Sequence, residues 1–140
     1  MGVLCLPIYA IETLTEPKTI VRFKPAINES SALASQGKHL WTLNDSGNGP
    51  YIFKFDKNGN ELGSYRIANT AISDWESLSS DNKFLYIGDI GNNFNRRKGL
   101  TIYRLAWKDI EQSYLPADRI TFMYADHKQG LPSSHDFDAE

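Results

Sequence analysis

The sequence of 140 residues contains a single cysteine, Cys5, so the chain cannot form an intramolecular disulfide and cysteine usage gives no indication of the redox compartment. It has no apolar run of the roughly 20 residues that a membrane-spanning helix needs. The net charge is −2, and apart from Arg96-Arg97-Lys98 the basic residues are scattered, whereas a nucleic-acid-binding protein needs a basic stripe. We therefore expect no nucleic-acid partner and no stable membrane span.

Recognisable catalytic motifs are absent as well. The three histidines, His39, His127 and His135, stand apart from any nucleophile motif of the Gly-x-Ser-x-Gly kind. No cysteine or histidine cluster has zinc spacing, and no glycine pattern suits a phosphate. The sequence therefore does not support nucleophilic catalysis, and it leaves open whether the protein is an enzyme.

Helical periodicity is almost absent, and short strand patterns follow one another along the chain. Residues 19–24 alternate between apolar and polar as a half-buried strand does, and residues 51–55 lead into Asn58-Gly59, which favours a tight hairpin turn. Only residues 107–114 could form one or two helical turns, before Pro116 ends them. The sequence therefore predicts an all-β chain.

One phrase of the sequence occurs twice. Residues 40–48 read LWTLNDSGN and residues 85–92 read LYIGDIGN; Asp45 matches Asp89 at a spacing of 44 residues. A four-stranded propeller blade repeats every 40 to 50 residues or so. Because one blade cannot bury its own faces, the repeat predicts a β-propeller, a ring of radially packed four-stranded antiparallel sheets.

The predicted strands amount to about two and a half blades. The blades cover residues 29–67 and 74–125, a last blade strand precedes them at 18–25, and a third blade begins at 136. The strands expected within them are residues 30–35, 38–44, 50–56 and 61–67, and then 75–80, 83–88, 100–105 and 119–124. Since closure takes at least four blades, we expect residues 18–140 to be part of a larger propeller domain.

Residues 1–17 are apolar at their start but lack a basic beginning. They are interpreted as a leader or the remnant of a signal peptide, with a buried strand as the alternative. A signal peptide would place the protein in the periplasm or outside the cell.

Acidic residues recur at corresponding places in the repeats. The first two strands of a blade are antiparallel, so the linker before the first strand and the loop after the second emerge on one face of the ring. Carboxylates gathered on such a rim repel one another unless a cation offsets their charge. The candidates for a hard-cation site, most plausibly for Ca²⁺, are Glu29, Asp74, Glu76 and Asp138.

We interpret Asp45 and Asp89 instead as turn residues that accept backbone N–H bonds. Gly47 and Gly91 would then supply the positive φ that these loops need.

Several large side chains have two possible roles. Arg96 and Arg97 could bind a phosphate or carboxylate, or could neutralise the acidic rim. Trp75, which stands between two acids, could contact a sugar or aromatic ligand, or could pack in the core. Trp41 and Tyr86 occupy matching positions of the repeat, and we expect both to fill the space between blades.

The motifs Asn-Asp-Ser-Gly-Asn at 44–48, Asp-Trp-Glu at 74–76 and Gly-Asp-Ile-Gly-Asn-Asn at 88–93 occur in order at blade spacing. As a set they resemble a group of largely uncharacterised bacterial exported β-propeller proteins, over residues 28–140. The sequence departs from that pattern at Ala32, where glycine is frequent, and at Ala106-Trp107, where Glu-Pro is common. In architecture alone it is also similar, more distantly, to six-bladed lactonase and calcium-dependent phytase propellers.

Two hypotheses of function follow. The first is an exported propeller domain that binds a small-molecule or protein ligand on its acidic rim, with Ca²⁺. The alternative is a metal-dependent hydrolase of the lactonase or phytase kind, in which Glu76 and Asp138 would hold the metal and Arg97 would orient an anionic substrate.

Overall fold

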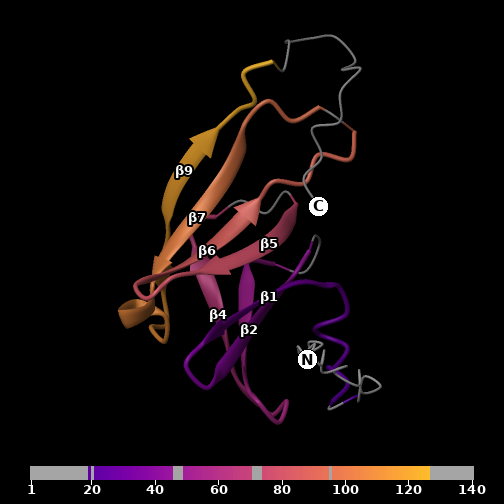
Figure 1. Cartoon of the computed structure of the whole chain (residues 1–140), viewed down its shortest axis with the longest axis vertical. Coiled ribbons are helices and arrows are strands. Elements are labelled where there is room, and N and C mark those ends of the chain that lie inside the picture. The colour runs from indigo at the N-terminus through magenta and orange to yellow at the C-terminus, as the bar shows by residue number, and fades with distance from the viewer. Residues whose placement is uncertain (1–18, 20, 46–48, 71–73, 95, 127–140) are drawn as a thin grey trace, which may run out of the picture.

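The computed structural model describes residues 19, 21–45, 49–70, 74–94 and 96–126, which form two β-sheets (Figure 1). The all-β prediction is confirmed, because the described part contains strands and one short 3-10 helix, Trp107–Asp109. Within it no helix is long and apolar enough to cross a membrane. The leader at 1–17 and the third blade predicted from 136 lie outside the described residues.

The first sheet begins with four strands in an antiparallel meander. They are β1 (Ser30–Gln36), β2 (His39–Asn44), β3 (Tyr51–Asp56) and β4 (Glu61–Ala68). The turn between β3 and β4 forms where Asn58-Gly59 predicts it. Gly59 has a φ of 83°, and one carboxylate oxygen of Asp56 accepts the backbone N–H groups of Asn58 and Asn60, each at 2.8 Å.

The second sheet repeats this order of pairing. Its strands are β5 (Trp75–Ser80), β6 (Phe84–Asp89), β7 (Leu100–Ala106) and β9 (Asp118–Phe122). The helical turns predicted at 107–114 are reduced to the 3-10 helix. The short strand β8 (Leu115–Pro116) then pairs in parallel with Ile67 and Ala68 of β4. Residues 107–117, called the crossing segment below, therefore leave the second sheet, extend the first and return.

The first two strands of the two sheets match residue by residue at an offset of 45. Ser30 lies opposite Asn44 in the first sheet, as Trp75 lies opposite Asp89 in the second. Asn44, and not Asp45, therefore corresponds to Asp89. The sequence alignment that matched the two aspartates is therefore wrong by one residue.

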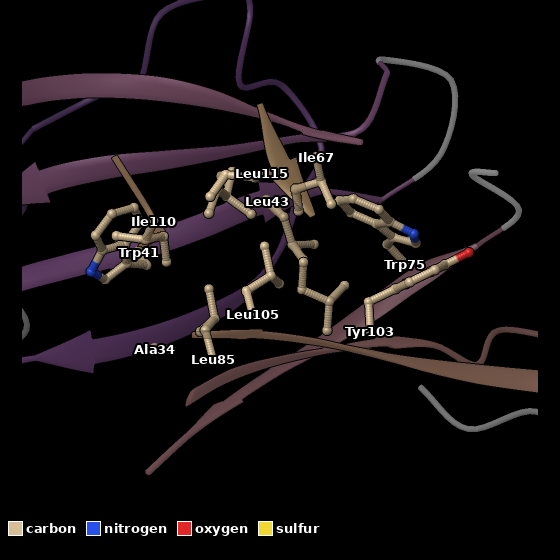
Figure 2. Close-up of a cluster of buried hydrophobic side chains, with 12 residues drawn as sticks. Ala34, Trp41, Leu43, Ile67, Trp75, Leu85, Tyr103, Leu105, Ile110 and Leu115 are labelled. Carbon is tan, nitrogen blue, oxygen red and sulfur yellow. The ribbon is translucent and has the colours of Figure 1, made fainter. Parts of the chain in front are cut away.

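The main core lies between the two sheets (Figure 2). The first sheet contributes Trp41, Leu43, Ile52 and Ile67; the second contributes Trp75, Leu85, Ile87, Tyr103 and Leu105; the crossing segment contributes Ile110 and Leu115. Trp41 is 1% exposed, as predicted. Its counterpart Tyr86 is only half-buried and donates its hydroxyl to Asp81 at 2.9 Å. Since Leu85 and Ile87 on either side of Tyr86 enter the core, Tyr86 faces away from the first sheet.

The opposite face of the first sheet carries a smaller cluster of Ile27, Phe53 and Phe55. The ring of Phe23 lies 4.8 Å from that of Phe55. No strand forms at residues 19 and 21–25, so the strand predicted at 18–25 is wrong for the part of it that the structure describes. Its apolar side chains pack against the face of the sheet without pairing to an edge.

The first strands of the two sheets, β1 and β5, lie side by side and run in the same direction. The hydroxyl of Ser31 donates to the carbonyl of Trp75 at 2.9 Å, and that of Ser80 donates to the carbonyl of Ser35 at 3.2 Å. This arrangement brings the beginnings of both strands to the same end of the molecule.

Candidate functional site

Three carboxylates meet at the end of the molecule where β1 and β5 begin. Asp45 follows β2 of the first sheet, Asp74 immediately precedes β5, and Glu76 is the second residue of β5. One oxygen of each can be chosen so that all three lie within 4.8 Å of one another, and all three residues are half-buried. We call this group the acidic triad. It joins side chains from both sheets.

Strand alternation brings Asp74 and Glu76 to one place. Residues two positions apart on an extended strand point to the same face, so both carboxylates lie on one side while Trp75 between them enters the core. The register of β5 against β6 shifts between Trp75 and Ser77, so Glu76 is also the extra residue of a β-bulge on β5.

Gly91 forms a wall of the acidic triad. A Cβ atom on Gly91 would lie 2.4 Å from Oδ2 of Asp74 and 2.8 Å from Oε1 of Glu76, which no real contact permits. The positive φ predicted for Gly91 is not found, since the described glycines with positive φ are Gly37, Gly49 and Gly59. Glycine is needed here because the two carboxylates approach its backbone closely.

Asp89 binds the backbone of the acidic triad at Asp74. Oδ1 of Asp89 accepts the N–H of Asp74 at 3.0 Å and lies 2.8 Å from the guanidinium of Arg97. Arg97 also donates to the carbonyl of Gly91 at 2.7 Å and to that of Asp89 at 3.1 Å. Burial raises the pKa of the Asp89 carboxyl, while the Asp74 N–H and Arg97 act in the opposite direction.

Carboxylates gather at this end of the part of the chain that the structure describes. They are those of the acidic triad and of Asp89, and the guanidinium of Arg97 is engaged with Asp89. Carboxylates at such separations disfavour one another's ionisation unless a cation or hydrogen-bond donors offset the charge. The arrangement can therefore bind a hard cation through oxygen ligands from two sheets.

The residues predicted as metal ligands have three outcomes. Asp74 and Glu76 come together as expected. Glu29 is exposed and is not a member of the triad; its carbonyl accepts the N–H of Asp45 at 2.9 Å. Asp138 lies outside the described residues. Asp45, interpreted from sequence as a turn residue, supplies the third carboxylate. Its position could have been inferred from the antiparallel pairing of the first two strands, which brings the loop after the second strand to the same face as the linker before the first.

The residues predicted to contact a ligand are placed differently from one another. Trp75 is fully buried and packs against Tyr103, with ring centroids 6.1 Å apart, as the core interpretation expects. Arg97 neutralises Asp89, which is the structural role considered for it. Arg96 is exposed, and its guanidinium lies 5.5 Å from the centroid of the exposed ring of Phe94. Of the three, Arg96 is the most accessible to a ligand.

Comparison of the chain with models of protein families, with curated proteins and with solved structures finds no match. The function of the acidic triad is therefore argued from its geometry.

Proposed function

We propose that this chain belongs to an exported β-propeller protein that binds Ca²⁺ through Asp45, Asp74 and Glu76 and presents a ligand-binding rim around the ion. The observation that carries the proposal is the convergence of three half-buried carboxylates from two sheets within 4.8 Å. Residues 29 positions apart along the chain, Asp45 and Asp74, reach this one place.

The ligand type favours calcium among the hard cations. Oxygen ligands of Ca²⁺ lie at about 2.3–2.6 Å, so two ligands of one ion stand at most roughly 5 Å apart. The oxygens of the triad lie within 4.8 Å of one another, so all three can contact one ion. Ca²⁺ accepts irregular arrangements of oxygen ligands, whereas Mg²⁺ requires a near-ideal octahedron and is usually held by only one or two carboxylates.

The propeller part of the proposal is supported by the likeness of the two sheets. Both begin with the same antiparallel meander, the registers of their first two strands match at an offset of 45, and β1 and β5 are neighbours with a common direction. Radial packing about an axis places the first strands of successive blades in this relation. In a complete propeller, a second triad would form only between two neighbouring blades that carry acidic residues at the positions of Asp45, Asp74 and Glu76.

The hydrolase alternative requires the guanidinium of Arg97 to orient a substrate. That guanidinium donates to Asp89 and to two carbonyls, so binding is favoured over hydrolysis.

A calcium titration followed by thermal unfolding tests the proposal. For a site with a dissociation constant on the order of 10⁻⁴ M, 10 mM Ca²⁺ stabilises the folded chain by about 2.7 kcal/mol, because the ion binds the native state alone. We expect the melting temperature to rise by several degrees, and to rise less in 10 mM Mg²⁺.

Asp74→Asn is the informative variant, since it removes one carboxylate and keeps the backbone N–H that Asp89 accepts. It should abolish most of the Ca²⁺-dependent shift. Asp126→Asn, at an exposed aspartate outside the triad, is the matched control and should retain it. An unchanged melting temperature of the wild-type chain at 10 mM Ca²⁺ would overturn the proposal.

A further inference from the structure

A cavity lies between the first sheet and the crossing segment, away from the acidic triad. Its volume is about 270 Å³, and Trp41, Lys54, Trp107 and Glu111 are among the residues that line it. Small-molecule sites begin at roughly 300 Å³, so the cavity suits a ligand of modest size. Trp41 and Asp45 are four residues apart along and just past β2, which corresponds to about 13 Å, since a strand rises by roughly 3.3 Å per residue.

Trp41 brings a buried hydrogen-bond donor to this cavity. The side chain is 1% exposed, and among the described residues its indole Nε1–H has no acceptor. Figure 2 shows this nitrogen at the outer end of the core cluster, pointing away from Leu105 and from Trp75. A buried N–H costs free energy unless an acceptor satisfies it, so an acceptor atom that reached this nitrogen would be favoured.

Lys54 brings a charged donor to the same place. Its side chain is 12% exposed, and its ammonium lies 5.5 Å from the centroid of a Trp41 ring. The ammonium binds the carboxylate of Glu111, which belongs to the crossing segment. The hydrogen bond from Lys54 holds the pKa of Glu111 below its usual value, so this carboxylate is ionised near neutral pH.

Glu111 reaches Lys54 from the solvent side. Its side chain is 60% exposed, whereas that of Lys54 is 12% exposed. The cavity therefore already accepts a carboxylate on Lys54, and a carboxylate from outside the chain would compete with that of Glu111 for the same ammonium. Lys108 also lines the cavity and adds a second cation near that place.

We infer that this cavity binds a small organic carboxylate, which replaces the Glu111 carboxylate on Lys54 and accepts a second hydrogen bond from Nε1–H of Trp41. A carboxylate has two oxygens, one for each of these donors. Trp107, whose ring centroid is 5.6 Å from that of Trp41, and Ile110 provide an apolar wall for the body of the ligand. The inference is independent of calcium and of the proposed function.

Benzoate is the probe that combines a carboxylate with a flat apolar body. The full chain is titrated with benzoate in the presence of a chelator while the indole N–H resonances of the tryptophans are followed by NMR. Trp41→Phe identifies the resonance of Trp41. We expect this resonance to shift saturably with benzoate, and acetate, which lacks the apolar body, to bind more weakly.

Two variants should change the affinity in opposite directions. Lys54→Met removes the charged donor and should weaken benzoate binding by about tenfold or more. Glu111→Gln removes the internal competitor and should strengthen binding by about two- to fivefold. Lys108→Met, at an exposed residue of the same wall, is the control and should change the affinity less than Lys54→Met does.

The inference is overturned if benzoate gives no saturable shift of the Trp41 resonance. Equal affinities of the wild-type chain and Lys54→Met would also overturn it. If Lys54→Met does not fold, Glu111→Gln is the deciding variant. Benzoate that replaces the Glu111 carboxylate on Lys54 must bind this variant more tightly than the wild type, and an equal or weaker affinity overturns the inference. Inorganic phosphate is the comparison anion, and binding of phosphate as tight as that of benzoate would contradict the role of the apolar wall.

Discussion

Arg97 lies 2.8 Å from the buried carboxylate of Asp89 and is its charged partner within the described residues. The carboxylate side chain is 4% exposed and that of Arg97 is 23% exposed, so water screens the pair weakly. Because Asp89 also accepts the N–H of Asp74, the pair fixes the backbone from which Asp74 and Glu76 project. The acidic triad therefore depends on a salt bridge that takes no part in it.

Removal of the guanidinium should destabilise the fold. Arg97→Met leaves the Asp89 charge buried without its partner, and we expect a loss of about 3 kcal/mol in the free energy of unfolding at pH 7. Denaturation with urea measures it. Arg96→Met, at the exposed neighbour in the same loop, is the control and should change stability by no more than about 0.5 kcal/mol. Equal effects of the two substitutions would contradict the structural role of Arg97.

The same pair makes a prediction about pH. Burial raises the pKa of Asp89 in the folded chain above its ordinary 3.8. In the pH window between 3.8 and the raised pKa, the folded chain therefore binds more protons than the unfolded chain. The contribution of Asp89 to stability therefore decreases as pH rises through that window. Arg97 opposes the shift, so in Arg97→Met the window should extend to higher pH. Measured from pH 4 to pH 7, the stability difference between wild type and Arg97→Met should grow, and a difference that shrinks would contradict this account.

Gly91→Ala should damage the cation site more than the sheet. The new methyl group would overlap the carboxylates of Asp74 and Glu76, and at least one must move. We expect the calcium-dependent rise in melting temperature to be strongly reduced. Gly99→Ala in the same loop is the control, because its Cβ would meet nothing nearer than 3.6 Å. A full calcium response in Gly91→Ala would indicate that the ion does not bind between these carboxylates.

The sequence predicts the parts of this fold that depend on local pattern. Within the two predicted blades, the strand at 75–80 has the observed bounds, and the other seven strands differ by one or two residues at an end. Asp45 lies beside Asp74 and Glu76, on the same face as the antiparallel pairing of neighbouring strands predicts, although the sequence suggested a turn residue and not a member of the cation site.

Parts that depend on distant contacts could not be predicted. The pairing of β8 with β4 is only two residues long and includes Pro116, so it leaves no periodic pattern in the sequence. Residues 21–25 alternate between apolar and polar as a strand does, but they form no strand. The ring of Phe23 packs instead on that of Phe55, which lies on the face of the sheet, and this contact leaves no local pattern in the sequence.

The match of Asp45 with Asp89 shows a further limit. Identity of residues suggested it, whereas the hydrogen-bond register places Asn44 opposite Ser30 as Asp89 is opposite Trp75. The side-chain amide of Asn44 donates to the carbonyl of Ala26 at 2.8 Å, where Asp89 accepts an N–H. An amide and a carboxylate at matching positions thus each bind the segment that precedes the first strand of their sheet, the amide as donor and the carboxylate as acceptor.

Trp41 and Tyr86 give a comparison between matching positions of the two sheets. Trp41→Ala should lower the free energy of unfolding by about 3–5 kcal/mol, since the indole is buried between the sheets. Tyr86→Ala removes a half-buried ring that faces away from the first sheet, and should cost about 1–2 kcal/mol. Urea denaturation of both variants checks the order, and a larger loss for Tyr86→Ala would contradict the observed packing.

Asp81 should make the turn between β5 and β6 sensitive to acid. Its carboxylate accepts the backbone N–H groups of Lys83 and Phe84 at 2.7 and 2.8 Å and the hydroxyl of Tyr86 at 2.9 Å, and these bonds hold the pKa of Asp81 below its usual 3.8. A carboxyl with a lowered folded pKa stabilises the fold above its unfolded pKa, and this contribution is lost as pH falls through the folded value. Asp81→Asn should therefore melt below the wild type at pH 7, and the two melting temperatures should approach each other below about pH 3.8. Because the carbonyl of Asp81 also accepts the indole N–H of Trp107 at 2.8 Å, loosening of this turn should reach the crossing segment. A gap between the two proteins that stays constant from pH 7 to pH 3 would mean that ionisation of Asp81 does not hold the turn.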